Sequence, residues 1–368
     1  MLTCTRLAIL FLFSIVLPAC GPSSDVESEV AELEKKNNQA PAKTPNDTPP
    51  APPLTKAPGP VTNDVRAEII LLVPDVRVPM HEFQRNGLAM LVGRQAGYML
   101  TTKDAAGSSA QQIEQFRQAI AAKPAAIIVE PIDPPALAAL IVEAQTAGVI
   151  VIGLDKRMLK EGCASIVYSD QRLLGRMAAD TVIEALKRKA TEESQPEVKG
   201  RVVQLRGAAD DHDSAEMAEG FSEGLRTQPG VILVHDTPAD WSAEAATQRT
   251  AEAFRLQKNF DVIYAHNDAI AVGAAKAAEA AGQRESIFII GTDGISGQKK
   301  GMELVREGEI DATIVRPALV DLALQIVVKL RADKTFKPEP AYEIQPVAVV
   351  PKNVEQSLRV GTYKLPRL

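Results

Sequence analysis

The sequence has few aromatic residues, few cysteines and no excess of basic residues. Phe, Trp and Tyr make up 4% of the 368 residues, with a single Trp, so any aromatic surface for stacking a ligand must be small. Three cysteines cannot form a disulfide framework. The net charge is −6, and a chain this acidic without a long basic run is not expected to bind nucleic acid. The hydrophobic (45%) and charged (24%) fractions are those of a globular protein and exclude a polytopic membrane protein.

The hydrophobic run at the N-terminus is too short to span a bilayer. It covers Leu7–Leu17, whereas a membrane span needs roughly 20 residues. With Arg6 before it, the run is typical of a signal peptide, for which we expect residues 1–19. It ends in Leu-Pro-Ala-Cys20-Gly, which resembles the bacterial lipobox. That resemblance implies that Cys20 is lipidated and becomes the mature N-terminus, and an ordinary signal peptide cut nearby is the alternative.

A proline-rich segment follows the expected lipidation site. Eight prolines fall between positions 41 and 60, among Ala and Thr residues, and such a sequence cannot bury a core. We therefore expect residues 20–66 to form a lipidated N-terminus and a tether. The remaining roughly 300 residues are enough for about two domains. Cys163 is left without an intramolecular partner and is expected to be a free thiol.

The rest of the chain alternates short apolar runs with helical patterns. Several runs are continuous and β-branched, which is typical of strands buried on both faces of a parallel sheet. Asp170, Ser109 and Ser214 stand where helix N-caps are expected, and Gly97 and Gly148 stand just after helices. The predicted strands are 69–73, 98–101, 126–129, 149–154, 165–168, 202–205, 232–235, 262–265, 287–291 and 312–315.

This alternation predicts an α/β fold with two doubly wound parallel-sheet lobes. The break falls near Ser165–Asp170, before a long predicted helix and a charged loop. Doubly wound sheets bind ligands outside the carboxyl ends of their strands. If those ends face each other, the cleft between the lobes is the binding site.

Polar side chains follow five of the predicted strands. Short carboxylates, an amide and an arginine on rigid strand ends suit hydrogen bonds to vicinal hydroxyls or to a charged small molecule. The alternative is that each Asp or Asn merely caps the next helix. The residues are Asp75, Asp155 with Lys156, Asn267, Asp293 and Arg316.

Several segments resemble, in order and spacing, the ribose- and galactose-type periplasmic solute-binding proteins, over about residues 67–350. The resemblance implies a type I periplasmic binding protein fold, whose lobes are joined by a three-segment hinge that closes on a ligand. It assigns 67–168 plus 317–345 to the N-terminal lobe and 169–316 plus 346–368 to the C-terminal lobe. The segments include Ile150-Val-Ile-Gly-Leu-Asp155, Glu219-Gly-Phe221, Ala265-His-Asn-Asp268, Gly291-Thr-Asp-Gly294 and Ala312-Thr-Ile314.

The resemblance also implies roles for single residues. Asp155, Asn267 and Asp293 match polar ligand contacts, and Trp241 matches an aromatic that packs on the sugar ring. Arg316 stands where the family usually has an amide. Other positions depart from the family pattern, so a pentose such as ribose fits no better than another sugar, a sugar derivative or a charged solute. The departures are Val78 for Asn, Met80-His81 for an aromatic pair, and Lys156 and Ala215 for Arg.

Other kinds of site have weaker signals. His81 could line the cleft or cover a helix start. The run Asp210-Asp-His-Asp213 could cap a helix, contact the ligand or bind a metal, and capping is favoured because adjacent residues rarely converge on one ion. No phosphate-binding glycine loop or nucleophile motif is present. We therefore expect the protein to bind no cofactor and no metal, and to have no enzymatic activity.

These observations predict a monomeric substrate-binding lipoprotein, anchored in the cell envelope and facing the periplasm. It would capture a sugar or sugar-like solute by hinge closure and deliver it to an ABC permease. A ligand-binding sensor that signals to a membrane kinase or chemoreceptor is the alternative. A transcriptional regulator with the same ligand-binding fold would need an N-terminal helix-turn-helix and a cytoplasmic address, whereas here a lipobox-like sequence and a proline-rich tether stand instead.

Overall fold

The computed structural model describes residues 66–155, 157–158, 161–297, 300–360 and 363–368. The expected signal peptide, Cys20, the tether up to residue 65 and Lys156 lie outside these residues. In the described part of the chain, no helix is long and apolar enough to cross a membrane.

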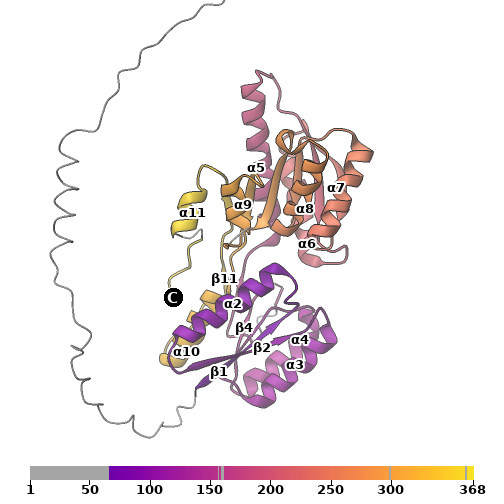
Figure 1. Ribbon diagram of the computed structural model, residues 1–368. Coiled ribbons are helices and arrows are strands. Elements are labelled where there is room, and N and C mark those ends of the chain that lie inside the picture. Colours follow the sequence, from indigo (N-terminus) through magenta and orange to yellow (C-terminus); the bar gives the residue numbers. More distant parts are fainter. Residues whose placement is uncertain (1–65, 156, 159–160, 298–299, 361–362) are drawn as a thin grey trace, which may run out of the picture. The chain divides into compact units, whose positions relative to one another are not determined.

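Twelve strands of the described residues form two six-stranded sheets, which carry most of the core (Figure 1). In the first sheet every pairing is parallel, as the continuous β-branched runs predict. Its strands, in spatial order, are β11 (Ala341–Glu343), β5 (Ser165–Tyr168), β4 (Ile150–Gly153), β3 (Ala126–Val129), β1 (Ala67–Val73) and β2 (Tyr98–Asp104).

The second sheet is parallel except at one edge. Its last strand, β12, runs antiparallel to β10, which the sequence did not predict. The spatial order is β12 (Val347–Val349), β10 (Ala312–Val315), β9 (Phe288–Asp293), β8 (Val262–Ala265), β6 (Gly200–Arg206) and β7 (Val231–Pro238). All ten predicted strands are present, and β11 and β12 are additional.

Helices cover both faces of each sheet, so both sheets are doubly wound. Successive residues of β1 show this directly, since Ile69 and Leu71 belong to one core cluster and Ile70 and Leu72 to another. In the first lobe, α2 (Pro79–Arg94) and α10 (Val320–Ala332) contribute to the first of these clusters, and α3 (Ser109–Ala122) and α4 (Pro134–Thr146) to the second.

The second lobe is built in the same way. On one face, α5 (Gln171–Glu192) and α6 (His212–Leu225) pack against the sheet. On the other face lie α7 (Ala243–Gln257), α8 (Asp268–Ala280), α9 (Gly301–Glu307) and α11 (Val354–Val360), and a short 3-10 helix spans Arg284–Ser286.

The helix starts correct part of the sequence interpretation. Asp170 caps α5 as predicted, accepting hydrogen bonds from the N–H groups of residues 172 and 173. Two other predicted caps are wrong. Ser108, not Ser109, caps α3, and Asp211, not Ser214, caps α6. The helix predicted from Pro317 begins at Val320, because Leu319 has a left-handed backbone with φ 68°.

The chain passes from one sheet to the other three times. It does so between β5 and β6, between β10 and β11, and between β11 and β12. Near the C-terminus, Leu365 and Leu368 pack against the first-sheet core beside α2 and α10. These two residues fall in the segment 346–368, which the sequence analysis placed in the second lobe, yet they contact the core of the first. Cys163 is a free cysteine.

Candidate functional site

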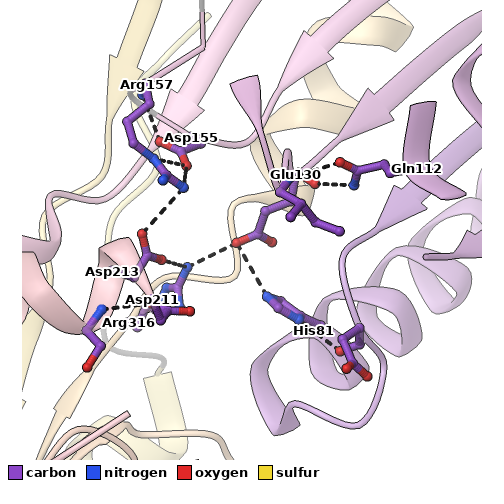
Figure 2. A network of polar contacts seen from close by, with 11 residues as sticks. His81, Gln112, Glu130, Asp155, Arg157, Asp211, Asp213 and Arg316 are labelled. Atoms are coloured by element: carbon purple, nitrogen blue, oxygen red, sulfur yellow. Dashed lines mark hydrogen bonds and ion pairs between the residues drawn. The ribbon is translucent and has the colours of Figure 1, made fainter. Parts of the chain in front are cut away.

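The carboxyl ends of strands from both sheets bring charged side chains together (Figure 2). Glu130 follows β3 of the first sheet, and Arg316 follows β10 of the second. Arg316 Nη2 donates to Glu130 Oε1 at 3.1 Å and to Asp213 Oδ2, in the first turn of α6, at 3.4 Å. Since α6 belongs to the second lobe, Arg316 links groups of both lobes.

Asp155 and Arg157 extend this network from the first lobe. Both follow β4, and Arg157 Nε donates to Asp155 Oδ2 at 2.7 Å. Arg157 Nη2 also lies 3.7 Å from Asp213 Oδ1. The lobes therefore meet through a chain of carboxylates and guanidinium groups, as Figure 2 shows.

His81 closes the network on the side of α2. Its Nδ1 lies 2.9 Å from the Asp75 carbonyl oxygen, and its Nε2 lies 3.7 Å from Glu130 Oε1. Burial alone would lower the pKa of His81, but the Glu130 carboxylate outweighs it and raises that pKa. Conversely, burial would raise the pKa of Glu130, but His81 and then Arg316 outweigh it and lower that pKa to about 2. Glu130 is therefore ionised at neutral pH.

Asp293 has a buried carboxylate for which the described residues provide no partner. It ends β9 and is 6% exposed, and neither a hydrogen bond nor an ion pair reaches its carboxylate from those residues. Burial raises its pKa to about 7, although Arg316 and His81 act in the opposite direction. Its φ of 98° lies in the region that favours glycine. Asp293 lines two cavities, of about 360 and 400 Å³.

Trp241 lies at a larger cavity of about 440 Å³, which Asp75 and His81 also line. The ring packs against the backbone of Gly207, where an added Cβ would stand 2.2 Å from Trp241 Cζ2. Only glycine at position 207 permits this ring position. Part of the indole also packs against the second-sheet core clusters, so the ring is both packed and cavity-lining.

Asn267 has a structural role as the cap of α8. Its Oδ1 accepts from the Ile270 N–H at 2.7 Å, and its Nδ2 lies 3.4 Å from the Trp241 carbonyl oxygen. This matches the alternative that strand-end residues cap helices. The next residue, Asp268, fixes the loop after β9, since its Oδ2 accepts from the Gly294 N–H at 2.8 Å and its Oδ1 from Thr313 Oγ1 at 2.7 Å.

The predicted site residues thus fall into groups. Asp75, His81 and Trp241 line the 440 Å³ cavity, where Asp75 is already bound to the exposed Arg77 (Nη2 to Oδ2, 2.6 Å). Asp155 and Arg316 belong to the ion-pair network, and Asp293 lies near Arg316.

The sequence interpretation missed Glu130 and Arg157 and left Asp213 ambiguous. Glu130 follows a buried strand in the same way as the predicted residues, so the same rule could have found it. Arg157 also follows a buried strand, two residues after Asp155, so the same rule could have pointed to it. In the run 210–213, Asp211 is the helix cap, and no group of residues in the described ranges could hold a metal ion.

Known proteins share this fold. The ribose import binding protein RbsB of Escherichia coli is 26% identical over 281 residues, which are 76% of this chain and 88% of that protein. A Caulobacter myo-inositol binding protein, solved with myo-inositol, is 24% identical with a TM-score of 0.68 and covers 80% of this chain and 97% of its own. The fructose-binding periplasmic domain of a hybrid two-component system is 22% identical with a TM-score of 0.66, covering 80% and 94%.

A family model extends this likeness over most of the chain. The model of the periplasmic binding protein domain matches residues 70–332, which is more than half of the sequence. The two doubly wound sheets, with polar groups gathered at their strand ends, are the type I architecture of such proteins. This chain therefore belongs to the periplasmic binding protein domain family, a family of solute-binding proteins and not of enzymes.

Proposed function

We propose that this protein is the substrate-binding lipoprotein of an ABC transporter and captures a sugar or sugar-like solute between its lobes. The observation that carries the proposal is the set of charged side chains at strand ends of both sheets, around a 440 Å³ cavity beside Trp241. Cavities of this size suit small ligands, and carboxylates and guanidinium groups suit their hydroxyls.

The lobes are proposed to be residues 67–168 plus 317–345 and residues 169–316 plus 346–368. A ligand that contacts both lobes shifts an equilibrium between open and closed forms toward the closed form. The contacts of Arg316 to Glu130 and Asp213 are the links that the ligand would share or replace.

Most of the proposed ligand-binding residues follow strand ends, whereas His81 lies in α2. Asp293 and Trp241 act from the second lobe, and His81 acts from the first. The side-chain amide of Asn267 holds the backbone carbonyl of Trp241, in addition to any contact that Asn267 makes with the ligand. The full set is Asp75, His81, Asp155, Lys156, Trp241, Asn267, Asp293 and Arg316, to which the geometry adds Glu130, Arg157 and Asp213.

The lipid anchor is a separate part of the proposal. It rests on the lipobox-like sequence before Cys20, and it would hold the protein at the envelope, facing the periplasm, with the proline-rich segment as tether. If Cys20 is the anchor, Cys20→Ser moves the mature protein out of the membrane fraction. Membrane association that survives this change would contradict the anchor but leave the binding function untouched.

A sensor is the second candidate function. The fructose-binding domain of a two-component system shares the fold, so the same closed form can be presented to a kinase or chemoreceptor instead of a permease. Co-purification with a permease or with a membrane kinase distinguishes the two.

A thermal-shift screen across neutral sugars, polyols, sugar acids and amino sugars tests the binding function. A ligand that binds only the folded state raises the melting temperature, by an amount that grows with its concentration above Kd. We expect at least one class to raise it. No shift from any member of the panel would contradict the proposal.

A further inference from the structure

The cleft holds more carboxylates than its arginines neutralise. Glu130, Asp155 and Asp213 share two guanidinium groups. Arg157 makes its close contact with Asp155, and Arg316 makes its closer contact with Glu130 at 3.1 Å. Asp213 receives the longer contact from each arginine, at 3.7 and 3.4 Å. In the described part of the chain, Asp213 is therefore the carboxylate with the weakest contacts to these two arginines.

The pKa of Asp213 also reflects this lack of nearby positive charge. Burial raises its pKa to about 6, Arg316 opposes that rise, and Asp155 and Asp211 add to it. The start of α6 favours an acidic side chain, but Asp211 already caps that helix. An additional positive charge near Asp213 would therefore stabilise its ionised carboxylate.

Two buried carboxylates close by have acceptor capacity left for a ligand. Glu130 is 7% exposed, and its Oε2 accepts no hydrogen bond of standard geometry in the described residues, although the Gln84 amide lies close enough to help lower the Glu130 pKa. Asp293 is equally buried as a residue and lines two cavities, and its carboxylate accepts no hydrogen bond from the described residues. Burying an acceptor unpaired costs free energy, so a ligand with several N–H or O–H donors would be stabilised here.

The cavity wall is acidic as well. Five carboxylates line the 440 Å³ cavity, and Arg157 is the arginine among its described lining residues. One of the five, Asp75, is neutralised by Arg77. Two histidines, His81 and His212, also line the cavity, and His81 adds a positive charge beside Glu130 when it is protonated. The remaining acids of the wall are Asp210, Asp211 and Asp213, all at the start of α6.

We propose that the solute bound in this cleft carries a protonated amine beside its hydroxyl groups, as an amino sugar or an amino polyol does, and that Glu130 and Asp213 hold the ammonium group. The inference rests on the proposed function and narrows its ligand class. An ammonium group supplies both the missing charge and up to three N–H donors. A neutral sugar supplies donors without charge, and a sugar acid adds a further negative charge to an acidic wall.

Matched ligands test the proposal directly. Titration calorimetry compares galactose, galactosamine and galacturonic acid, the same series built on glucose, and myo-inositol with its monoamino analogue, all at pH 7.5. We expect an amine to bind at least tenfold more tightly than the neutral compound with the same ring. Its affinity should also fall as salt is added, because salt screens charge interactions.

A charge-neutral variant locates the ammonium group. Asp213→Asn keeps the size of the side chain and removes its charge, so the preference for the amine over its neutral counterpart should fall about tenfold. Asp180→Asn makes the same change on the exposed surface of α5 and should leave the preference unchanged. Melting temperatures of both variants show that they are folded.

The outcomes separate this inference from the proposed function. If a neutral sugar or a sugar acid binds as tightly as the matching amine, the amine inference is wrong and the binding function stands. If the amine is preferred but Asp213→Asn keeps the preference, the assignment of the ammonium to Asp213 is wrong. If no member of any series binds, the amine inference is contradicted, and the thermal-shift screen alone decides the binding function.

Discussion

Asp293 keeps two unfavourable features that a purely structural residue would not need. Its carboxylate is buried with no hydrogen-bond donor among the described residues, and its backbone has a φ of 98°. Buried unpaired acceptors and left-handed backbone each cost free energy, and such strain clusters at functional sites. This supports the proposal that Asp293 is kept for the ligand and that the free protein is less stable because of it.

Asp293→Asn should therefore stabilise the free protein, most strongly at high pH. Because the pKa is raised from 3.8 to about 7, the folded state holds more protons than the unfolded state in that range, and the free energy of unfolding falls as the pH rises through it. A tenfold change in proton affinity corresponds to about 1.4 kcal/mol. We expect a gain of at least about 1 kcal/mol at pH 8 and a smaller gain at pH 5. A melting temperature at pH 8 equal to that of the original protein would contradict this account.

Gly207 tests the position of the Trp241 ring. A Cβ at residue 207 would stand 2.2 Å from Trp241 Cζ2, so Gly207→Ala must displace the ring. We expect a shift in the fluorescence of this single tryptophan and weaker binding of any ligand that the screen identifies. Gly93→Ala is the control, because an added Cβ at this exposed position of α2 meets nothing within 4 Å. An unchanged spectrum for Gly207→Ala would contradict the packing described.

At the scale of elements, the strands were largely readable from the sequence. Short apolar runs alternating with helical patterns identified ten of the strands. Several of these runs are continuous and β-branched, because a strand buried on both faces needs apolar residues throughout. The strands β11 (Ala341–Glu343) and β12 (Val347–Val349) were missed, because a strand of three residues is too short to show a periodic pattern. Their pairing depends on where the chain returns to each sheet, which is a tertiary property.

The candidate site was predictable in part for the same reason. A polar residue after a buried strand is a local feature, and it pointed to Asp155, Asp293 and Arg316. Which acids share which arginine is decided by residues far apart in sequence, as in the contact between Arg316 and Glu130, so the sequence could not show it. Helix starts were also ambiguous, because several candidates stand within a few residues of each other.

The start of α6 allows a direct test of which residue caps the helix. Asp211 Oδ1 accepts from the Ser214 N–H at 2.8 Å, whereas the exposed neighbour Asp210 is bonded to no helix N–H group of the described structure. Losing an N-cap costs about 1 kcal/mol. Asp211→Ala should therefore lower the free energy of unfolding by about that amount in urea titration, and Asp210→Ala should change it little. Equal effects would show that Asp211 is not the cap.

At the scale of the whole molecule, the chain passes between the sheets three times, and its charged strand ends meet across them. A ligand bound there would touch residues of both lobes, which is the condition for a closed form to be stabilised by binding. The family provides the precedent for two such lobes, and the cleft of this chain is lined by charged side chains. Its specificity is thus expected to depend on charge more than on ring stacking, because Trp241 is the one tryptophan available.

Calorimetric titration of variants from both lobes tests the central claim, that the ligand is bound between them. His81→Ala removes a group of the first lobe and Asp293→Ala one of the second. Hydrogen bonds to charged groups contribute about 1.5–3 kcal/mol, so each change should weaken binding by roughly one to two powers of ten. Asp311→Ala, at the opposite end of β10, should bind like the original protein. Normal binding by His81→Ala and Asp293→Ala, with binding lost in Asp311→Ala, would contradict a site between the lobes.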